Sequence, residues 1–240
     1  MAASEQRRLA DAKEKLIVAL DFPTTGEAEA LIDRLGDAVD FYKIGLELAF
    51  AGGLPLARDL AKAGKRIFLD LKLHDIPVTV SRACAQIVRS GASFLTVHAY
   101  PQTMRAAQSE AAGSPLRLLG VTVLTSCDDA DLKEAGYAYG VSELVSRRAM
   151  QAFETGLDGL VLSAKEAATV RERFGPKFIL VTPGIRPLGQ GDADQKRTVT
   201  PGAAITAGAD YLVIGRPVTR AEDPREAAMA IIEEMADALP

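Results

Sequence analysis

Three charged side chains with the chemistry of an acid–base site follow one apolar run, in the segment Phe68-Leu-Asp-Leu-Lys-Leu-His-Asp-Ile-Pro77. If residues 67–70 form a strand, side-chain alternation places Asp70 and Lys72 on the same side, with Asp75 beyond the strand end. Two carboxylates would then flank one ammonium group, which keeps the lysine protonated and suits it to deliver a proton to carbon. The same spacing also occurs in surface ion pairs, so the choice between a site and an ion pair depends on the rest of the chain.

Composition excludes several classes of function. The chain has 240 residues, 48% of them hydrophobic, and a net charge of -4, so it offers no basic field for nucleic acid. No apolar run approaches the roughly 18 residues of a membrane span. Cys84 and Cys127 are far apart and have neither disulfide nor zinc spacing, which favours reduced thiols in a cytoplasmic protein. Residues 1–14 are polar and lack a signal-peptide core, so we expect a tail or a lead-in helix.

Strand-like and helix-like segments alternate along the whole chain. Helical spacing is found at residues 26–35, 54–63, 78–88, 141–153 and 224–236, among others. Short β-rich runs occupy residues 16–20, 41–44, 67–69, 94–97, 118–123, 159–162, 178–181 and 211–214. Eight βα units in this length predict an α/β fold, a closed (β/α)8 TIM barrel that forms a single domain over residues 1–240. An open doubly wound sheet is the alternative, although the first strand lacks the Gly-rich fingerprint of dinucleotide binding.

In a barrel, reacting groups lie at the carboxyl ends of the strands. Asp21 ends the first predicted strand, Lys43 lies near the end of the second, and Asp70 and Lys72 end the third. Buried charges must be paired or used, and the barrel would bring these four side chains to one mouth. Their convergence from three strands favours a site over separate salt bridges.

These residues, together with three further motifs, closely resemble the orotidine 5'-monophosphate decarboxylase family, whose members make UMP in pyrimidine biosynthesis. The resemblance runs nearly end to end. Beside the segment at residues 68–77, it is carried by Val121-Thr-Val-Leu-Thr-Ser126, Val181-Thr-Pro-Gly-Ile-Arg-Pro187 and Val213-Ile-Gly-Arg-Pro-Val-Thr219. A chain without a fused phosphoribosyltransferase domain is typical of the free-standing, bacterial type of the family.

The resemblance implies a reaction that needs no metal and no cofactor. Its catalytic array would be Lys43, Asp70, Lys72 and Asp75, with Lys72 as the proton donor to pyrimidine C6 after carbon dioxide leaves. The family pattern also implies a homodimer in which Asp75 and Thr79 contribute to the neighbouring site.

The same resemblance assigns contacts to a nucleotide substrate. Asp21 and Lys43 would hold the ribose hydroxyls, and Thr125 would contact the pyrimidine. Phosphate binding also has a physical basis, because Gly215 and Arg216 follow the last predicted strand. Barrels often place backbone amides and a forked guanidinium group at this position to bind phosphate oxygens.

Arg186 and Gln195 match family positions on the preceding loop, residues 184–200. This loop carries little apolar anchoring, so we expect it to act as a lid over the phosphate. The resemblance therefore adds both residues to the predicted substrate contacts.

Two alternative functions stay open at this point. A magnesium-dependent keto-sugar-phosphate decarboxylase or aldolase of the same barrel group would need an acidic metal ligand near the second strand, where Glu47 is the only close candidate. A non-catalytic nucleotide-binding barrel is the other alternative. His74 is expected to have a positioning or packing role. His98 is expected to be a structural histidine, because no Cys or His lies nearby at ligand spacing.

Overall fold

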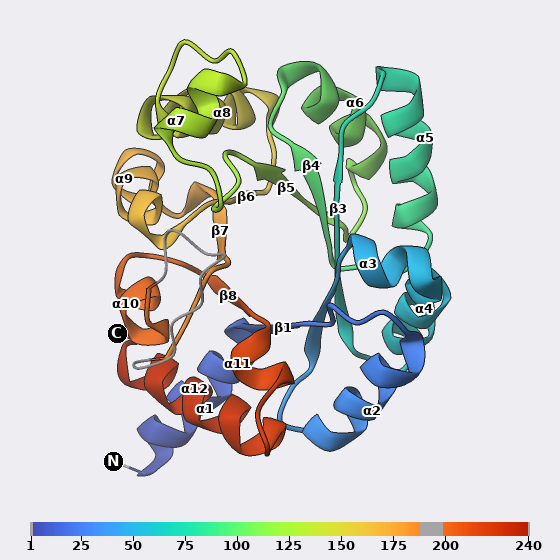
Figure 1. Cartoon of the computed structure of the whole chain (residues 1–240), viewed down its shortest axis with the longest axis vertical. Helices are drawn as coiled ribbons and strands as arrows, with labels where there is room; N and C mark the ends of the chain where they lie inside the picture. The colour runs from blue at the N-terminus through green and yellow to red at the C-terminus, as the bar shows by residue number, and fades with distance from the viewer. Residues whose placement is uncertain (1, 188–198, 240) are drawn as a thin grey trace.

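Eight parallel strands form a closed barrel in chain order, as Figure 1 shows in a view along the barrel. The computed structural model describes residues 2–187 and 199–239. The barrel prediction is confirmed, and the alternative of an open sheet is wrong. The strands are β1 (Leu16–Ala19), β2 (Phe41–Ile44), β3 (Arg66–Leu73), β4 (Phe94–His98), β5 (Arg117–Val121), β6 (Gly159–Val161), β7 (Ile179–Thr182) and β8 (Tyr211–Ile214).

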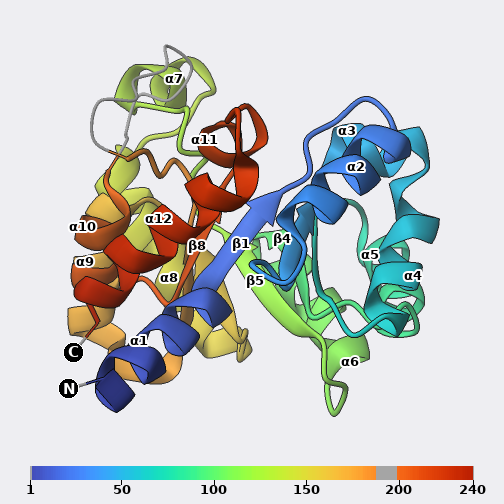
Figure 2. The ribbon, with the colours of Figure 1, turned by 90° about the horizontal axis from the view of Figure 1, so that it is seen from below.

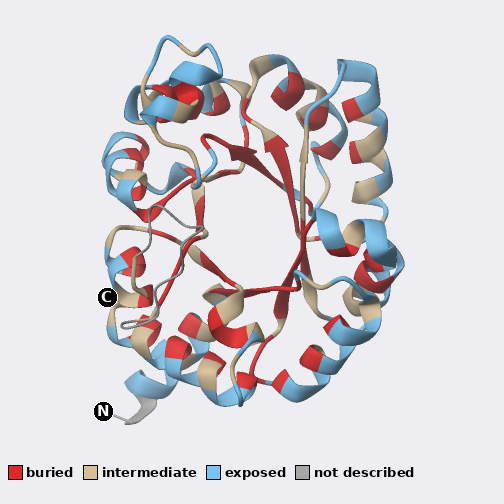
Figure 3. Ribbon diagram, viewed as in Figure 1, coloured by how far each residue is buried: buried red, intermediate tan, exposed pale blue. Residues whose placement is uncertain are grey.

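Helices surround the barrel and bury only the faces that touch it (Figure 3). Several begin with a Pro in the first turn, where the missing N–H has no helical partner to lose. In the described parts of the chain, no helix is both long enough and apolar enough to cross a membrane. The helical segments are α1 (Ala2–Lys15), α2 (Thr25–Leu35), α3 (Leu46–Leu48), η1 (Ala49–Gly53), α4 (Leu54–Lys62), α5 (Pro77–Val88), α6 (Pro101–Ala111), α7 (Asp129–Glu134), α8 (Val141–Thr155), α9 (Ala164–Phe174), η2 (Gly175–Lys177), α10 (Pro201–Thr206), α11 (Arg216–Thr219) and α12 (Pro224–Asp237).

Side-chain alternation along the strands divides the core into two parts. Outward-facing residues join the helices in one large cluster, whereas Phe41, Phe68 and Phe94 belong to a second cluster inside the barrel. Their rings pack edge to face, with centroids 5.0 Å apart for Phe41 and Phe94 and 5.9 Å apart for Phe68 and Phe94. The next inward positions toward the carboxyl ends are Lys43, Asp70 and Thr96, so the aromatic layer lies beneath a polar layer.

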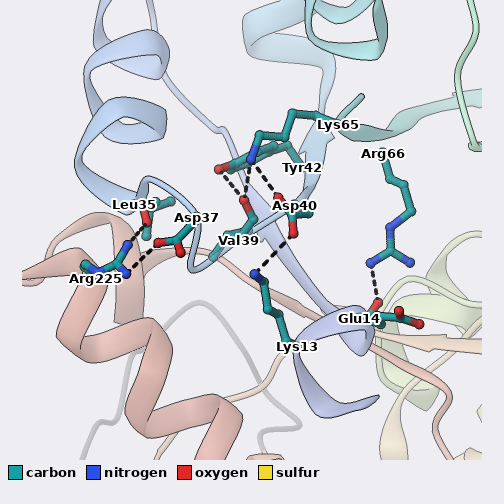
Figure 4. Close-up of polar contacts among 10 residues, drawn as sticks. All are labelled: Lys13, Glu14, Leu35, Asp37, Val39, Asp40, Tyr42, Lys65, Arg66 and Arg225. Carbon is teal, nitrogen blue, oxygen red and sulfur yellow. Dashed lines mark hydrogen bonds and ion pairs between the residues drawn. The ribbon is translucent and has the colours of Figure 1, made fainter. Parts of the chain in front are cut away.

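The amino end of the barrel is tied together by polar contacts (Figure 4). Asp40, just before β2, accepts a hydrogen bond from Lys65 Nζ at 2.7 Å and pairs with Lys13 of α1 at 3.3 Å. Arg66 donates to the Glu14 carbonyl at 2.7 Å. In Figure 2, α1 lies at the end of the barrel opposite α7 and α11. These contacts attach the lead-in helix to the end of the barrel that lies away from the predicted site.

Candidate active site

A cavity of about 590 Å³ opens at the carboxyl ends of the strands. Phe68, Ala19 and Val213 of the interior cluster form part of its wall. Eight of the residues predicted from the sequence also line it. They are Asp21, Lys43, Asp70, Lys72, Thr125, Arg186, Gly215 and Arg216. The cavity is large enough for a small-molecule ligand and combines apolar walls with convergent charges.

Asp70 is the centre of the charged group in this cavity. Its Oδ1 accepts a hydrogen bond from Lys72 Nζ at 2.8 Å, and its Oδ2 lies 3.6 Å from Lys43 Nζ. Lys43 in turn donates to Asp21 Oδ1 at 2.9 Å. Burial alone would raise the pKa of Asp70, but the Lys43 and Lys72 charges and hydrogen bonds from Lys72 and Thr96 hold the pKa below its ordinary value. The carboxylate therefore stays ionised between two ammonium groups.

The third strand extends further than its apolar run indicates. We expected it to end near Asp70, but β3 continues to Leu73 and includes Lys72. Its register with β4 shifts between Leu69 and Leu73, and Lys72 has a φ of 48°. No other non-glycine residue in the described chain has a positive φ. Asp70 and Lys72 both line the cavity, as their predicted position on one side requires, but they lie within an irregular part of the strand rather than at its end.

Gly45 is a site residue that the sequence motifs did not reveal. A Cβ at this position would lie 3.0 Å from Lys43 Nζ and 3.1 Å from Asp21 Oδ1. The bare backbone at Gly45 therefore leaves the room in which these two side chains pair. The only signal in the sequence was a glycine directly after the second apolar run.

Asp75 and Thr79 do not line the cavity of their own chain, and both are exposed. Asp75 Oδ1 accepts a hydrogen bond from the Ile76 N–H at 2.6 Å. In the described chain the ion pair of Lys72 is with Asp70, and none joins Lys72 to Asp75. The connection after β3 carries Asp75 outward because it turns directly into α5.

The predicted phosphate contacts converge on one side of the cavity. Gly215 follows β8, Arg216 is the first residue of α11, and the buried Arg186 follows β7. The Arg186 N–H donates to the Val199 carbonyl at 3.0 Å, so both ends of the predicted lid are held together. Gln195 lies outside the described residues.

The two histidines lie beside the charged group. His74 stacks on Tyr100 with ring centroids 4.4 Å apart, a contact that fits a positioning role. Burial, with nearby His74, Arg148 and Lys72, lowers the pKa of His98, which keeps the ring neutral. The described residues contain no group of three or more His, Cys, Asp or Glu side chains that could hold a metal ion.

Tyr100 lies between β4 and α6 and contacts side chains from several neighbouring segments. Besides stacking on His74, its ring lies 4.7 Å from the Arg148 guanidinium, and its hydroxyl contacts that of Tyr137. Arg148 also donates to the Thr122 carbonyl. The aromatic side chain thus connects the ends of β3 and β5, where the cavity wall turns into loops.

Comparison with known proteins assigns the family. Residues 14–231 match the Orotidine 5'-phosphate decarboxylase / HUMPS family. The chain is 62% identical over 227 residues to orotidine 5'-phosphate decarboxylase of a Bradyrhizobium species, covering 95% of this chain and 93% of the relative. It is 61% identical to that of Methylobacterium nodulans, with 94% and 97% covered. The crystal structure of orotidine 5'-phosphate decarboxylase from Lactobacillus acidophilus superimposes with a TM-score of 0.81 at 36% identity, with 92% of this chain and 98% of that chain covered. The chain therefore belongs to the orotidine 5'-phosphate decarboxylase / HUMPS family.

Proposed function

We propose that this protein is a carboxy-lyase that converts orotidine 5'-phosphate to UMP and carbon dioxide in de novo pyrimidine biosynthesis. The observation that carries the proposal is the Lys72 ammonium group at the cavity wall, held 2.8 Å from the largely enclosed Asp70. The names of relatives that cover nearly the whole chain support the same reaction.

Lys72 is the proton donor in this proposal. The bond between C6 and the carboxylate breaks, carbon dioxide leaves, and the electron pair stays on C6, where resonance offers little relief. The nearby ammonium stabilises this charge and then donates its proton to C6. Lys43, on the other side of Asp70, holds the group of charged side chains together. The proposed reaction needs no added cofactor or metal.

Asp70 acts through its charge. A substrate carboxylate placed about 4 Å from it would be repelled by roughly 4 kcal/mol at an effective dielectric of about 20. Carbon dioxide is neutral and the negative charge moves to C6, beside the Lys72 ammonium group, so the repulsion between the two carboxylates is relieved as the bond breaks. The lowered pKa of Asp70 supports this role, because the group is charged when substrate binds.

The remaining lining residues bind the nucleotide. Asp21 and Lys43 hold the ribose hydroxyls and Thr125 contacts the pyrimidine. Gly215, Arg216 and Arg186 hold the phosphate, together with Gln195. These phosphate contacts lie away from the breaking bond, so their binding energy fixes the pyrimidine against the charged group.

The active unit is a homodimer, and each of its two active sites receives Asp75 and Thr79 from the neighbouring subunit. Exposed apolar side chains at the start of α5 and on the α3–η1 segment support this assembly. Ile76 is 63% exposed beside Asp75, and Phe50 on η1 is 89% exposed. Both views of the fold place α3, α4 and α5 on the same side of the barrel (Figures 1 and 2). Two unpaired cysteines, Cys84 and Cys127, support a cytoplasmic location.

Turnover in the presence of EDTA tests the reaction itself. Purified protein is incubated with orotidine 5'-phosphate, and loss of the substrate's ultraviolet absorbance and formation of UMP are followed. Full activity in EDTA is expected. Activity that EDTA removes and magnesium restores would favour the keto-sugar-phosphate enzyme, because Glu47 also lines the cavity. Tight UMP binding without turnover would favour the non-catalytic barrel.

Mixing two inactive variants tests the shared site. Lys72→Ala and Asp75→Asn are each expected to be inactive, but a hybrid dimer has one site with both wild-type residues. Random exchange of subunits should recover about a quarter of the wild-type activity, since half of the dimers are hybrids with one intact site. No recovery in a mixture with proven subunit exchange would place Asp75 in the site of its own chain.

A further inference from the structure

The pairing of β3 with β4 is interrupted where the charged residues lie. Leu69 pairs with Leu95 and Leu73 pairs with Val97, so three residues of β3 face the single residue Thr96 of β4. A bulge of this kind bends the strand and removes backbone groups from the regular ladder. It also places Lys72 at a φ of 48°, a conformation that side chains rarely adopt.

Thr96 supplies the contacts that the ladder lacks. Its side chain is fully buried, and its Oγ1 accepts a hydrogen bond from the Lys72 backbone N–H at 2.9 Å. The same hydroxyl donates to Asp70 Oδ1 at 2.9 Å. One hydroxyl offers one proton and two lone pairs, so both bonds can form at once.

These bonds close a ring through the charged pair. Lys72 Nζ donates to Asp70 Oδ1 at 2.8 Å, and Asp70 and the Lys72 backbone both bond the Thr96 hydroxyl. The direction of the ammonium group therefore depends on a strained backbone that the hydroxyl holds. Phe94, two residues earlier on β4, belongs to the interior cluster.

Thr96 does not line the cavity, so it cannot act by touching a substrate there. We propose that Thr96 is a positioning residue, whose hydroxyl holds the Lys72 backbone and the Asp70 carboxylate in the geometry needed for proton delivery. This inference rests on the proposed decarboxylation. A displacement of about 1 Å in such a group reduces turnover by about 10²-fold.

Two pairs of variants isolate the hydroxyl. Thr96→Val keeps the branched shape without the hydroxyl, and Thr96→Ser keeps the hydroxyl without the methyl group. The alanine and serine variants differ from each other by the hydroxyl alone. If Thr96→Val does not fold, Thr96→Ala is therefore compared with Thr96→Ser instead. Thr182→Val is the matched control, because Thr182 is a fully buried strand threonine whose hydroxyl has no hydrogen-bond partner in the described chain.

The kinetic constants of these variants distinguish a role of Thr96 in positioning Lys72 and Asp70 from a role in stabilising the fold. Thr96→Val should lower kcat by about 10- to 100-fold with KM changed less than about threefold, and Thr96→Ser should restore most of kcat. Thr182→Val should leave both constants unchanged. Equal loss in the valine and serine variants, or a change confined to KM, would overturn the proposal.

Amide hydrogen exchange gives a readout that does not depend on the reaction. The Lys72 amide of the substrate-free protein should exchange faster in Thr96→Val than in wild type or Thr96→Ser, since its acceptor is removed. Unchanged exchange would overturn the proposed hydrogen bond. If wild type shows no decarboxylation but the Lys72 amide responds as expected, then the proposed reaction fails while the positioning contact stands.

Discussion

Two aspartates in this barrel each lie between two lysines, at opposite ends of the strands. At the amino end, Asp40 lies 2.7 Å from Lys65 Nζ and 3.3 Å from Lys13 Nζ. At the carboxyl end, Asp70 lies 2.8 Å from Lys72 Nζ and 3.6 Å from Lys43 Nζ. In charge and distance the two groups are nearly alike.

Their surroundings differ. The Asp40 side chain is 44% exposed, whereas that of Asp70 is 13% exposed and faces the cavity. Lys65 also donates to the Val39 carbonyl at 3.1 Å, so the group at the amino end fastens backbone segments together (Figure 4). Lys72 instead sits on strained backbone within a bulge.

An aspartate with two lysines, here called an ion triad, is therefore not by itself an active site. The two triads are Asp40 with Lys13 and Lys65, and Asp70 with Lys43 and Lys72. Exposed pairs contribute little to stability because water screens them. Enclosing charges carries a desolvation penalty that apolar residues would avoid, so the largely enclosed group of Lys43, Asp70 and Lys72 at a cavity points to function. The location at the carboxyl ends and the open cavity distinguish Asp70 from Asp40.

The largest difference is expected from removing one lysine of each triad. Lys72→Ala should lower kcat by about 10²- to 10⁴-fold, the range of a lost general acid. Lys65→Ala should leave kcat unchanged and lower the free energy of unfolding by about 1 kcal/mol or less. Initial rates and urea unfolding measure the two effects, and equal kinetic losses would contradict the distinction between the ends.

Two arginines extend the comparison to substrate binding. Arg216→Gln should raise KM by about 10- to 100-fold, because a hydrogen bond to a charged group contributes about 1.5–3 kcal/mol. Arg225 donates to the Leu35 carbonyl at 2.8 Å and to Asp37 at 2.6 Å, away from the cavity. Arg225→Gln should therefore leave KM unchanged. A KM for Arg216→Gln equal to that of wild type would remove Arg216 from the phosphate site.

The smallest effect concerns stability in acid. Burial opposes ionisation of both aspartates, but Lys65 and Lys13 lower the pKa of Asp40, and Lys43 and Lys72 lower that of Asp70. A lowered folded-state pKa gives stability that is complete above the ordinary value of 3.8 and is lost as pH falls through the folded-state value.

Asn substitution should therefore flatten the acid decline in the free energy of unfolding. The effect should be greater for Asp70→Asn than for Asp40→Asn, since Asp70 is less screened by solvent. Urea unfolding between pH 7 and about pH 3 measures both slopes. Equal pH dependence of the free energy of unfolding in the two variants would mean that the lower exposure of Asp70 does not make its ion pairs more stabilising than those of Asp40.

The sequence by itself determined the barrel and most of the cavity wall. Its apolar runs repeat at the spacing of βα units, and carboxyl ends of parallel strands must meet at one face, so Asp21, Lys43, Asp70 and Lys72 could be brought together without coordinates. Local patterns of this kind depend on alternation and on residue type, both of which are visible in the chain.

Only the tertiary structure decided how the charged residues are held. The irregular part of β3 depends on its register with β4, a contact between segments about 26 residues apart that alternation cannot reveal. Thr96 and Gly45 carry no charge and no motif, and they matter because of what lies beside them. Likewise, Asp40 and Asp70 look alike as charged residues in the sequence. The greater enclosure of Asp70 by neighbouring strands and helices distinguishes the candidate site from the exposed ion pairs of Asp40.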